Sequence, residues 1–264
     1  MDKVPPQHAF LDLSDYARPA ARWLVDRLPP FVTPIHLTLA FTLVGTAAAT
    51  LFAFDRWLPL ASLLLLVKSA LDAADGSLAR ARRRPSRVGR FLDSVCDFMV
   101  TVMVFCGIAF ANWRTHRDAS VWLLAGLAIL SATLQCSVFS YYYVRYRGQT
   151  GGDGTSRIRE TVEGDTSDNP TAFAILFQLY RLIYGWQDSL MAAIDQRLAP
   201  NAPVPRGFLT ATTVLGLGTQ LLVVAVCALL GRPVITLWLF VSLFNLYWLA
   251  LLIARYATRN STAI

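Results

Sequence analysis

The sequence predicts an all-α integral membrane protein, with six transmembrane helices and an interfacial amphipathic helix before the first span. Its 264 residues are 55% hydrophobic and only 16% charged, which is less charge than a soluble domain of this length needs on its surface. The apolar residues also occur in runs of about 20, long enough to cross roughly 30 Å of hydrocarbon. These two observations exclude an ordinary soluble domain.

Residues 8–29 are too charged to cross a membrane, but their apolar side chains could share one helix face. We therefore expect an interfacial helix here, bent or divided at Pro19. The first ten residues lack the apolar core of a cleavable signal peptide, so we expect the first span to be retained. The residues of the shared face are Phe10, Leu11, Leu13, Tyr16, Ala17, Trp23, Leu24 and Leu28.

Six apolar runs follow the interfacial segment. Thr33-Pro34 is expected to begin the first span, as N-cap and first helical residue. A short turn joins the first two spans, and an arginine-rich segment with a break at Pro85 joins the second to the third. The predicted spans are 35–54, 57–79, 92–112, 119–143, 207–230 and 234–254.

The chain between the fourth and fifth spans is expected to stay outside the hydrocarbon. Residues 148–170 are polar and rich in glycine, which predicts a flexible loop. Residues 171–198 are apolar with polar interruptions, which favours a second interfacial helix; a seventh, tilted span is the alternative. The regions are therefore 1–31, 32–147 with the first four spans, 148–204 with the loop and interfacial helix, and 205–264 with the last two spans.

The distribution of Lys and Arg predicts the orientation in the membrane. With the N-terminus in the cytosol, 19 of the 24 basic residues face the cytosol, 4 lie on the opposite side, and Lys68 lies within a span. Both termini are then cytosolic, in the inner membrane if the source is bacterial. This bias and the attraction of anionic lipids explain the net charge of +7 without a nucleic-acid partner.

Four aspartates lie where the second and third spans meet the cytosol. Asp72 and Asp75 are three residues apart, and Asp93 and Asp97 are four apart, so each pair shares a helix face. The short connection makes the two helices antiparallel neighbours, and the four carboxylates can converge. Unpaired charges in a membrane are costly, but Mg²⁺ or Mn²⁺ takes oxygen ligands, and such a cluster could bridge two ions. Solvated helix-end charges paired with nearby arginines are the alternative.

The residues around these aspartates suggest a binding surface for a nucleotide. Gly76 and Ala79 could let a flat ring approach the helix, and Arg80 could hold a phosphate. Gly89 could allow close helix packing. Lys68 lies one turn before the first aspartate and would either neutralise carboxylate charge or contact an acceptor.

The pattern Asp72-x2-Asp75-Gly76-x2-Ala79-Arg80-x8-Gly89-x3-Asp93-x3-Asp97 resembles the signature of the CDP-alcohol phosphotransferases. All eight signature residues are present, within 26 residues of chain. The resemblance implies metal ligands at Asp72, Asp75, Asp93 and Asp97, with Asp97 also the general base. It also implies nucleotide contacts at Asp72, Gly76, Ala79, Arg80 and Gly89.

The resemblance implies attack of an acceptor hydroxyl on the phosphorus of a CDP-linked donor, with release of CMP, in phospholipid biosynthesis. Two Mg²⁺ or Mn²⁺ ions and a homodimer are also expected. Metal ions and arginine suit a transition state that spreads negative charge over phosphoryl oxygens. A carboxylate one turn deeper than the ligands could take the proton from the alcohol.

The chain departs from the family pattern at the first span, where Ile35 follows Pro34 in place of Asn or Asp. His36 or Thr38 could contact the nucleotide edge instead, although a capping or packing histidine is the alternative. Farther along, Arg145, Arg147 and Arg255 could bind an acceptor phosphate or simply anchor helix ends.

Three kinds of function remain open at this point. CDP-diacylglycerol with a polar alcohol acceptor is the first expectation, and CDP-choline or CDP-ethanolamine with a lipid alcohol is the alternative within the family. An intramembrane prenyltransferase also binds pyrophosphate through aspartates. A divalent-cation transporter would line a path with intramembrane carboxylates.

Overall fold

The computed structural model describes residues 4–82, 86–152 and 169–258, and all regular structure in these residues is helical. The longer helices are α1 (Arg18–Val25), α2 (Pro34–Phe54), α3 (Leu58–Ala81), α4 (Arg87–His116), α5 (Ser120–Gln149), α6 (Pro170–Tyr180), α7 (Trp186–Leu198), α8 (Arg206–Thr212), α9 (Leu217–Leu229), α10 (Ile235–Val241) and α11 (Leu243–Ala257). Short 3-10 turns are η1 (Pro6–His8), η2 (Leu13–Asp15) and η4 (Thr213–Leu215), and η3 (Arg181–Gly185) is a π-helical segment between α6 and α7.

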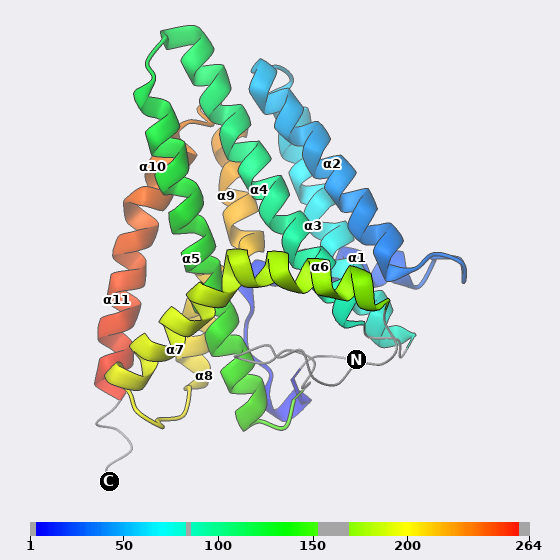
Figure 1. The fold of residues 1–264 in the computed structure, drawn as a ribbon, viewed down its shortest axis with the longest axis vertical. Helices are drawn as coiled ribbons and strands as arrows, with labels where there is room; N and C mark the ends of the chain where they lie inside the picture. Colours follow the sequence, from blue (N-terminus) through cyan, green and yellow to red (C-terminus); the bar gives the residue numbers. More distant parts are fainter. Residues whose placement is uncertain (1–3, 83–85, 153–168, 259–264) are drawn as a thin grey trace.

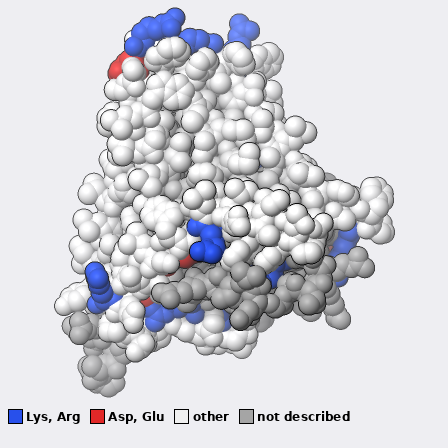
Figure 2. Space-filling model, viewed as in Figure 1, with Lys and Arg blue, Asp and Glu red and all other residues white. Residues whose placement is uncertain are grey.

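The long helices form a bundle, and a smaller set lies across one end of it (Figure 1). Helix α2 packs against α3 and α4, α3 also packs against α9, and α5 packs against α4 and α10. Helices α6 and α7 run across the bundle at the end where α1 lies and α11 finishes. Figure 2 shows a wide band without charged residues on this face, between basic groups at the two ends.

Within the described residues, four helices are long and apolar enough to cross a membrane: α2, α4, α5 and the α10–α11 pair over Ile235–Ala257. A fifth candidate is the pair Arg206–Leu215 and Leu217–Leu229, which is bent by 43° at Gly216. Helix α3 has the length of a span, but every 18-residue stretch of it contains Lys68, Asp72 and Asp75. Of the six predicted spans, α3 is thus the one absent from these candidates. It carries the lysine and the two aspartates that the sequence analysis singled out.

Each predicted span coincides with a helix or a pair of helices whose ends differ from the prediction by up to six residues, whereas four or five of them pass as membrane spans. A helix signal explains the start of the first. Thr33 is the N-cap of α2, where its side chain accepts a hydrogen bond from the His36 N–H, and Pro34 is the first helical residue. The short turn between α2 and α3 contains Asp55 and Trp57 in the left-handed region. The predicted break at Pro85 and most of the predicted loop 148–170 lie outside the described residues.

The N-terminal region differs from the single interfacial helix expected over 8–29. Its α-helix extends only from Arg18 to Val25, because Pro19 fits the first helical turn but would break a longer helix. Residues 10–17, which we call the N-terminal segment, instead pass between helices. The Leu13 N–H donates to Thr213 Oγ1 at 3.1 Å, and the Tyr16 hydroxyl donates to Ser69 Oγ at 3.1 Å.

Glycine allows this segment to lie against α9. A Cβ atom at Gly218 would be 1.8 Å from the carbonyl oxygen of Ser14, so no larger residue fits without displacement of the backbone. The same kind of contact brings α2 and α4 together, since a Cβ atom at Gly107 would be 2.6 Å from the Ala49 carbonyl oxygen. Close packing at Gly89 is not seen among the described residues, where a Cβ atom there would meet Ser86 alone within 4 Å, at 3.7 Å or more.

Candidate active site

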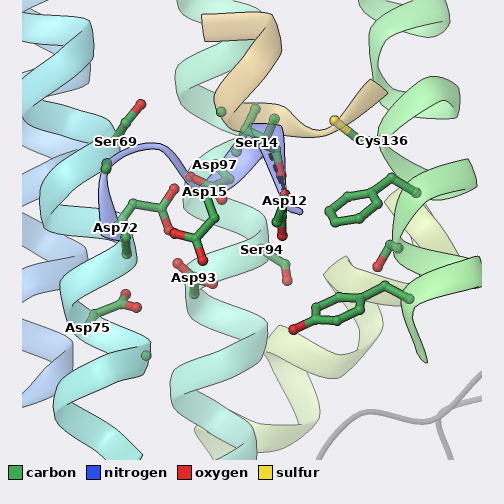
Figure 3. A pocket seen from close by; sticks show the side chains of 18 of the residues that line it. Asp12, Ser14, Asp15, Ser69, Asp72, Asp75, Asp93, Ser94, Asp97 and Cys136 are labelled. Atoms are coloured by element: carbon green, nitrogen blue, oxygen red, sulfur yellow. Dashed lines mark hydrogen bonds between the residues drawn. The ribbon is translucent and has the colours of Figure 1, made fainter. Parts of the chain in front are cut away.

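Helices α3 and α4 bring three carboxylates together at one end of the bundle (Figure 3). Asp72 and Asp75 lie on α3, and Asp93 lies on the neighbouring α4. One oxygen from each of the three carboxylates lies within 4.8 Å of the other two. The helical spacing that predicted convergence of these aspartates is therefore found in the structure.

The cluster of three carboxylates is negatively charged, and one of its oxygens has no hydrogen-bond donor among the described residues. Thr38 Oγ1 donates to Asp75 Oδ2 at 2.9 Å, but Asp93 Oδ1 is buried and accepts no hydrogen bond from the residues that the structure describes. A buried polar atom without a partner is unfavourable and uncommon. Three converging carboxylates, one of which has an unsatisfied oxygen, suit a hard divalent cation such as Mg²⁺ or Mn²⁺.

Asp97 lies one turn deeper along α4 and is held differently. Its Oδ1 accepts a hydrogen bond from Lys68 Nζ, which also donates to Asp72 Oδ2 at 2.7 Å. Lys68 is fully buried and does not line the neighbouring cavity. Of the two roles expected for Lys68, the structure contains the contacts that neutralise carboxylate charge.

A cavity of about 620 Å³ opens beside the carboxylates. Its walls come from α3, α4, α5, the α6–α7 region, the start of α9 and the N-terminal segment. All four aspartates line it, together with Gly76 and Arg80. The space is large enough for a small ligand, and the four motif carboxylates lie on the wall that α3 and α4 form.

Of the five predicted nucleotide contacts, Asp72, Gly76 and Arg80 line this cavity and two do not. A Cβ atom at Gly76 would be 3.2 Å from Arg80 Nη1, so the guanidinium lies directly beside the open face of this glycine. Arg80 also donates to Ser77 Oγ at 3.3 Å. Ala79 and Gly89 are absent from the cavity lining.

His36 and Arg145, the other expected contacts, also lie away from the cavity lining. His36 is exposed, and its Nδ1 accepts the Thr33 N–H at 3.2 Å, which completes a capping box. Arg145 pairs with Asp195 and donates to the Ala202 carbonyl at 2.9 Å. These contacts correspond to the capping and anchoring alternatives.

The remaining arginines also have structural contacts. Arg255 is fully buried, and its Nε donates to Asp195 Oδ1 at 2.7 Å while its other nitrogens bond the carbonyls of Ala202 and Pro203 at 2.8 Å. The Arg147 guanidinium is buried 4.9 Å from the centre of the Tyr143 ring. Arg255 therefore links α11 to α7 and to the residues before α8, whereas this contact of Arg147 lies within α5.

The sequence did not identify the contribution of the N-terminal segment to the cavity. Asp12, Ser14 and Asp15 line it, and Figure 3 shows them beside the carboxylates of α3 and α4. Burial raises the pKa of the Asp12 carboxyl, although hydrogen bonds from Ser14 oppose the shift. The one local signal was a polar Asp-x-Ser-Asp run within an otherwise apolar face.

The α6–α7 region also contributes residues that the sequence did not single out. Tyr180, Tyr184 and Asp188 line the cavity. The Tyr184 hydroxyl donates to the Ser94 carbonyl of α4 at 3.2 Å, and the Tyr180 hydroxyl donates to Asp188 at 3.2 Å. Tyr184 belongs to the π-helical segment η3, an irregularity that is frequent at functional sites.

Comparison with known proteins identifies relatives that share part of this chain. The archaetidylinositol phosphate synthase of Pyrococcus horikoshii is 32% identical over 136 residues, which are 51% of this chain and 64% of that protein. Cholinephosphotransferase 1 of Gallus gallus is 32% identical over 109 residues, 38% of this chain and 32% of that protein. The chain thus spans less than two thirds of either relative.

Among solved structures, phosphatidylinositol phosphate synthase PgsA1 of Mycobacterium tuberculosis with CDP-DAG bound is similar, with 22% identity and a TM-score of 0.39. The match covers 84% of this chain and 94% of that one. The model of the CDP-alcohol phosphatidyltransferase family matches residues 29–193, more than half of the chain and all of the aspartate motif. The predicted family is confirmed: this chain belongs to the CDP-alcohol phosphatidyltransferases, a family of transferases.

Proposed function

We propose that this chain transfers a substituted phosphate from a CDP-linked donor to an alcohol hydroxyl and releases CMP, as a step of phospholipid biosynthesis. The observation that carries this proposal is the group of three carboxylates on the cavity wall, one of which has a buried, unsatisfied oxygen. Family membership supports a transferase over the divalent-cation transporter and the prenyltransferase.

Each motif residue beside the cavity receives a role. Asp72, Asp75 and Asp93 would hold Mg²⁺ or Mn²⁺, which when bound neutralises charge that develops on the phosphoryl oxygens. The hydrogen bond from Thr38 orients the Asp75 carboxylate. Arg80, beside Gly76 on the cavity wall, would contact the donor phosphates.

Asp97 is the general base in this proposal. It lines the cavity one helical turn deeper than Asp93, and Lys68 restrains its carboxylate. As the acceptor oxygen forms its bond to phosphorus, the hydroxyl proton passes to Asp97. The bond from phosphorus to the CMP oxygen breaks, and CMP leaves with that electron pair.

The proposal includes six spans: α2, α3, α4, α5, α8–α9 and α10–α11. The 19-to-4 bias of basic residues supports a cytosolic active site and cytosolic termini. Helices α1 and α6–α7 would lie in the cytosolic interface of the membrane. The exposed apolar side chains of α6–α7 support this: they are Ile175, Leu179, Leu182, Trp186 and Leu190.

CDP-diacylglycerol with a polar alcohol is the donor and acceptor pair that we favour, since relatives of this chain are synthases of archaetidylinositol phosphate. The similarity to a cholinephosphotransferase supports the alternative, CDP-choline or CDP-ethanolamine with a lipid alcohol. A homodimer is also proposed, and crosslinking with native mass measurement tests it: a monomer would contradict it.

The test is CMP release by the purified full chain with Mg²⁺ or Mn²⁺. CDP-diacylglycerol is paired with a panel of alcohols, and CDP-choline and CDP-ethanolamine are paired with diacylglycerol. We expect release with one donor class, its loss in Asp93→Asn, and its retention in the control His36→Ala. Release that persists without metal, or Mn²⁺ uptake by liposomes without any CMP release, would contradict the proposal.

A further inference from the structure

The cavity has a second wall that the aspartate motif does not account for. We use this name for the lining residues of the N-terminal segment, α5 and the α6–α7 region. Within the described part of the chain, these lining residues include no lysine and no arginine. The charged members of the second wall are Asp12, Asp15 and Asp188, and Tyr180 and Tyr184 add aromatic rings. The second wall is therefore acidic and aromatic.

The basic residues of the lining lie on other elements. The three arginines that line the cavity are on α1 and α3, which pack against each other: Arg18, Arg22 and Arg80. The arginines that the sequence offered as contacts for an acceptor phosphate are outside the lining: Arg145, Arg147 and Arg255. The described residues of the second wall thus offer no guanidinium or ammonium group to a phosphate.

The charge of the whole lining also disfavours a phosphorylated acceptor. Eight aspartates and three arginines line the cavity. Bound metal would offset part of this excess, but the pyrophosphate of a CDP-linked donor brings further negative charge to the same space. Like charges repel strongly where water is excluded. A positively charged acceptor would reduce the imbalance, whereas a phosphate would increase it.

Asp12 is the carboxylate of the second wall that has the least compensation from the described residues. Asp15 pairs with Arg18, and Asp188 accepts a hydrogen bond from a tyrosine hydroxyl at 3.2 Å. Asp12 Oδ1 accepts hydrogen bonds from the Ser14 N–H at 3.0 Å and from the Ser14 hydroxyl at 2.6 Å, but Oδ2 accepts none from the described residues. The Oδ2 atom is therefore available to a ligand in the cavity.

We propose that the acceptor of this chain is an alcohol that carries an ammonium group and no phosphate, and that Asp12 binds this ammonium group. The inference rests on the proposed function, because it concerns the acceptor of that reaction. Asp12 and the proposed base Asp97 line the same cavity, so a small amino alcohol can direct its charge to one and its hydroxyl to the other (Figure 3). The rings of Tyr180 and Tyr184 suit a primary or a quaternary ammonium group.

The experiment compares alcohols of matched size and different charge in CMP release from CDP-diacylglycerol, by the purified full chain with Mn²⁺. Ethanolamine is paired with ethylene glycol, and serinol with glycerol, so that an ammonium group replaces one hydroxyl in each pair. Choline adds a quaternary ammonium group, and glycerol 3-phosphate adds a phosphate. We expect kcat/KM to be at least about 10-fold higher for the ammonium-bearing member of a pair, as a charge-assisted hydrogen bond would give.

Asp12→Asn tests the residue itself, because its amide oxygen still accepts the hydrogen bonds from Ser14. This variant should raise the KM for the ammonium-bearing alcohol by about 10–100-fold and the KM for its neutral partner much less. Mn²⁺-dependent CDP binding should not change. Asp55→Asn is the control, since it makes the same charge change at an exposed position just after α2.

Three results would overturn the inference and leave the proposed function standing. They are faster release with glycerol 3-phosphate than with any ammonium-bearing alcohol, equal rates within each pair, and equal changes of KM for both members of a pair in Asp12→Asn. Release only from CDP-choline or CDP-ethanolamine with diacylglycerol would overturn it in the same way. No CMP release from any donor and acceptor would contradict the proposed function and this inference together.

Discussion

Two groups of buried charge in this molecule differ in how completely they are balanced. Asp195 of α7 is fully buried, yet it accepts hydrogen bonds from Tyr141 and Tyr142 at 3.1 and 3.0 Å and pairs with Arg145 and Arg255. The carboxylates of α3 and α4 have one bonded lysine among their described contacts, and an oxygen of Asp93 is left without a donor.

This difference distinguishes the Asp195 group, which stabilises the fold, from the α3–α4 carboxylates, which form a binding site. The Asp195 group connects α5, α7 and α11 and contributes nothing to the cavity lining. The α3–α4 group lines the cavity and has excess negative charge. Buried charges that are satisfied internally hold helices together, whereas charges left unsatisfied beside a cavity mark the place for a ligand.

The largest expected effect is on the rate of CMP release, and it comes from the α3–α4 carboxylates, whose charge is not balanced. Asp97→Asn should lower the rate of CMP release by about 10²–10⁴-fold, the usual contribution of a general base, and should keep Mn²⁺-dependent CDP binding. Asp75→Asn should lose transfer and binding together, because it removes a proposed ligand. CMP release and calorimetric CDP binding on both variants measure this, and equal loss of binding in the two would refute the division of roles.

A substitution in the balanced Asp195 group should lower the free energy of unfolding and should not act directly on the reaction. Asp195→Asn leaves Arg145 and Arg255 without their carboxylate, and breaking a buried pair costs about 3–5 kcal/mol of unfolding free energy. Denaturant unfolding in detergent measures the loss, with Asp93→Asn as the control, because it removes a carboxylate of the other group whose Oδ1 accepts no hydrogen bond among the described residues. A loss below about 1 kcal/mol would show that Asp195 is not the structural centre inferred here.

A smaller effect is expected where the N-terminal segment contacts α9. Gly218→Ala would force Ser14 to move, and such overpacking costs about 1–3 kcal/mol. Activity should also fall, since Asp12 and Asp15 beside Ser14 line the cavity. Thermal unfolding and CMP release measure both effects. Gly126→Ala is the control, because a Cβ atom there meets nothing within 4 Å, and equal behaviour of the two variants would contradict a role for this contact.

The smallest effect is expected at His36. His36→Ala removes the side-chain acceptor for the Thr33 N–H at the start of α2, and a single hydrogen bond at an exposed helix end is worth about 1 kcal/mol. Melting temperature should fall slightly and CMP release should not change. A large loss of CMP release in a folded His36→Ala protein would contradict this and would indicate that His36 acts in the active site.

The sequence predicts the parts of this molecule that depend on local spacing. Apolar length gives the helices, and i, i+3 and i, i+4 spacing on two adjacent helices brings the aspartates together. The Lys68 contact with Asp72 follows the same rule. In α3, the charged residues Lys68, Asp72 and Asp75 indicate the site. The same three residues make the helix too polar to count as a candidate membrane span.

The remaining features depend on contacts between distant parts of the chain. The Asp195 group joins residues that are 50 to 60 positions apart, and no local pattern connects them. The position of Ser14 depends on Gly218, a glycine that looks unremarkable within an apolar helix. The interfacial helix expected over 8–29, bent or divided at Pro19, is α-helical only over Arg18–Val25 for a related reason. Before it, Leu13 and Tyr16 hydrogen-bond to Thr213 and Ser69, which are distant in the sequence.

The most direct test of an unbalanced carboxylate site is CDP binding to the purified chain with and without Mn²⁺, by calorimetry. We predict binding in Mn²⁺, its loss after chelation, and a drop of at least about 10–100-fold in Mn²⁺ affinity in Asp93→Asn. CDP binding that is equally tight after chelation and in Asp93→Asn would contradict the claim that these carboxylates hold a metal ion for the nucleotide.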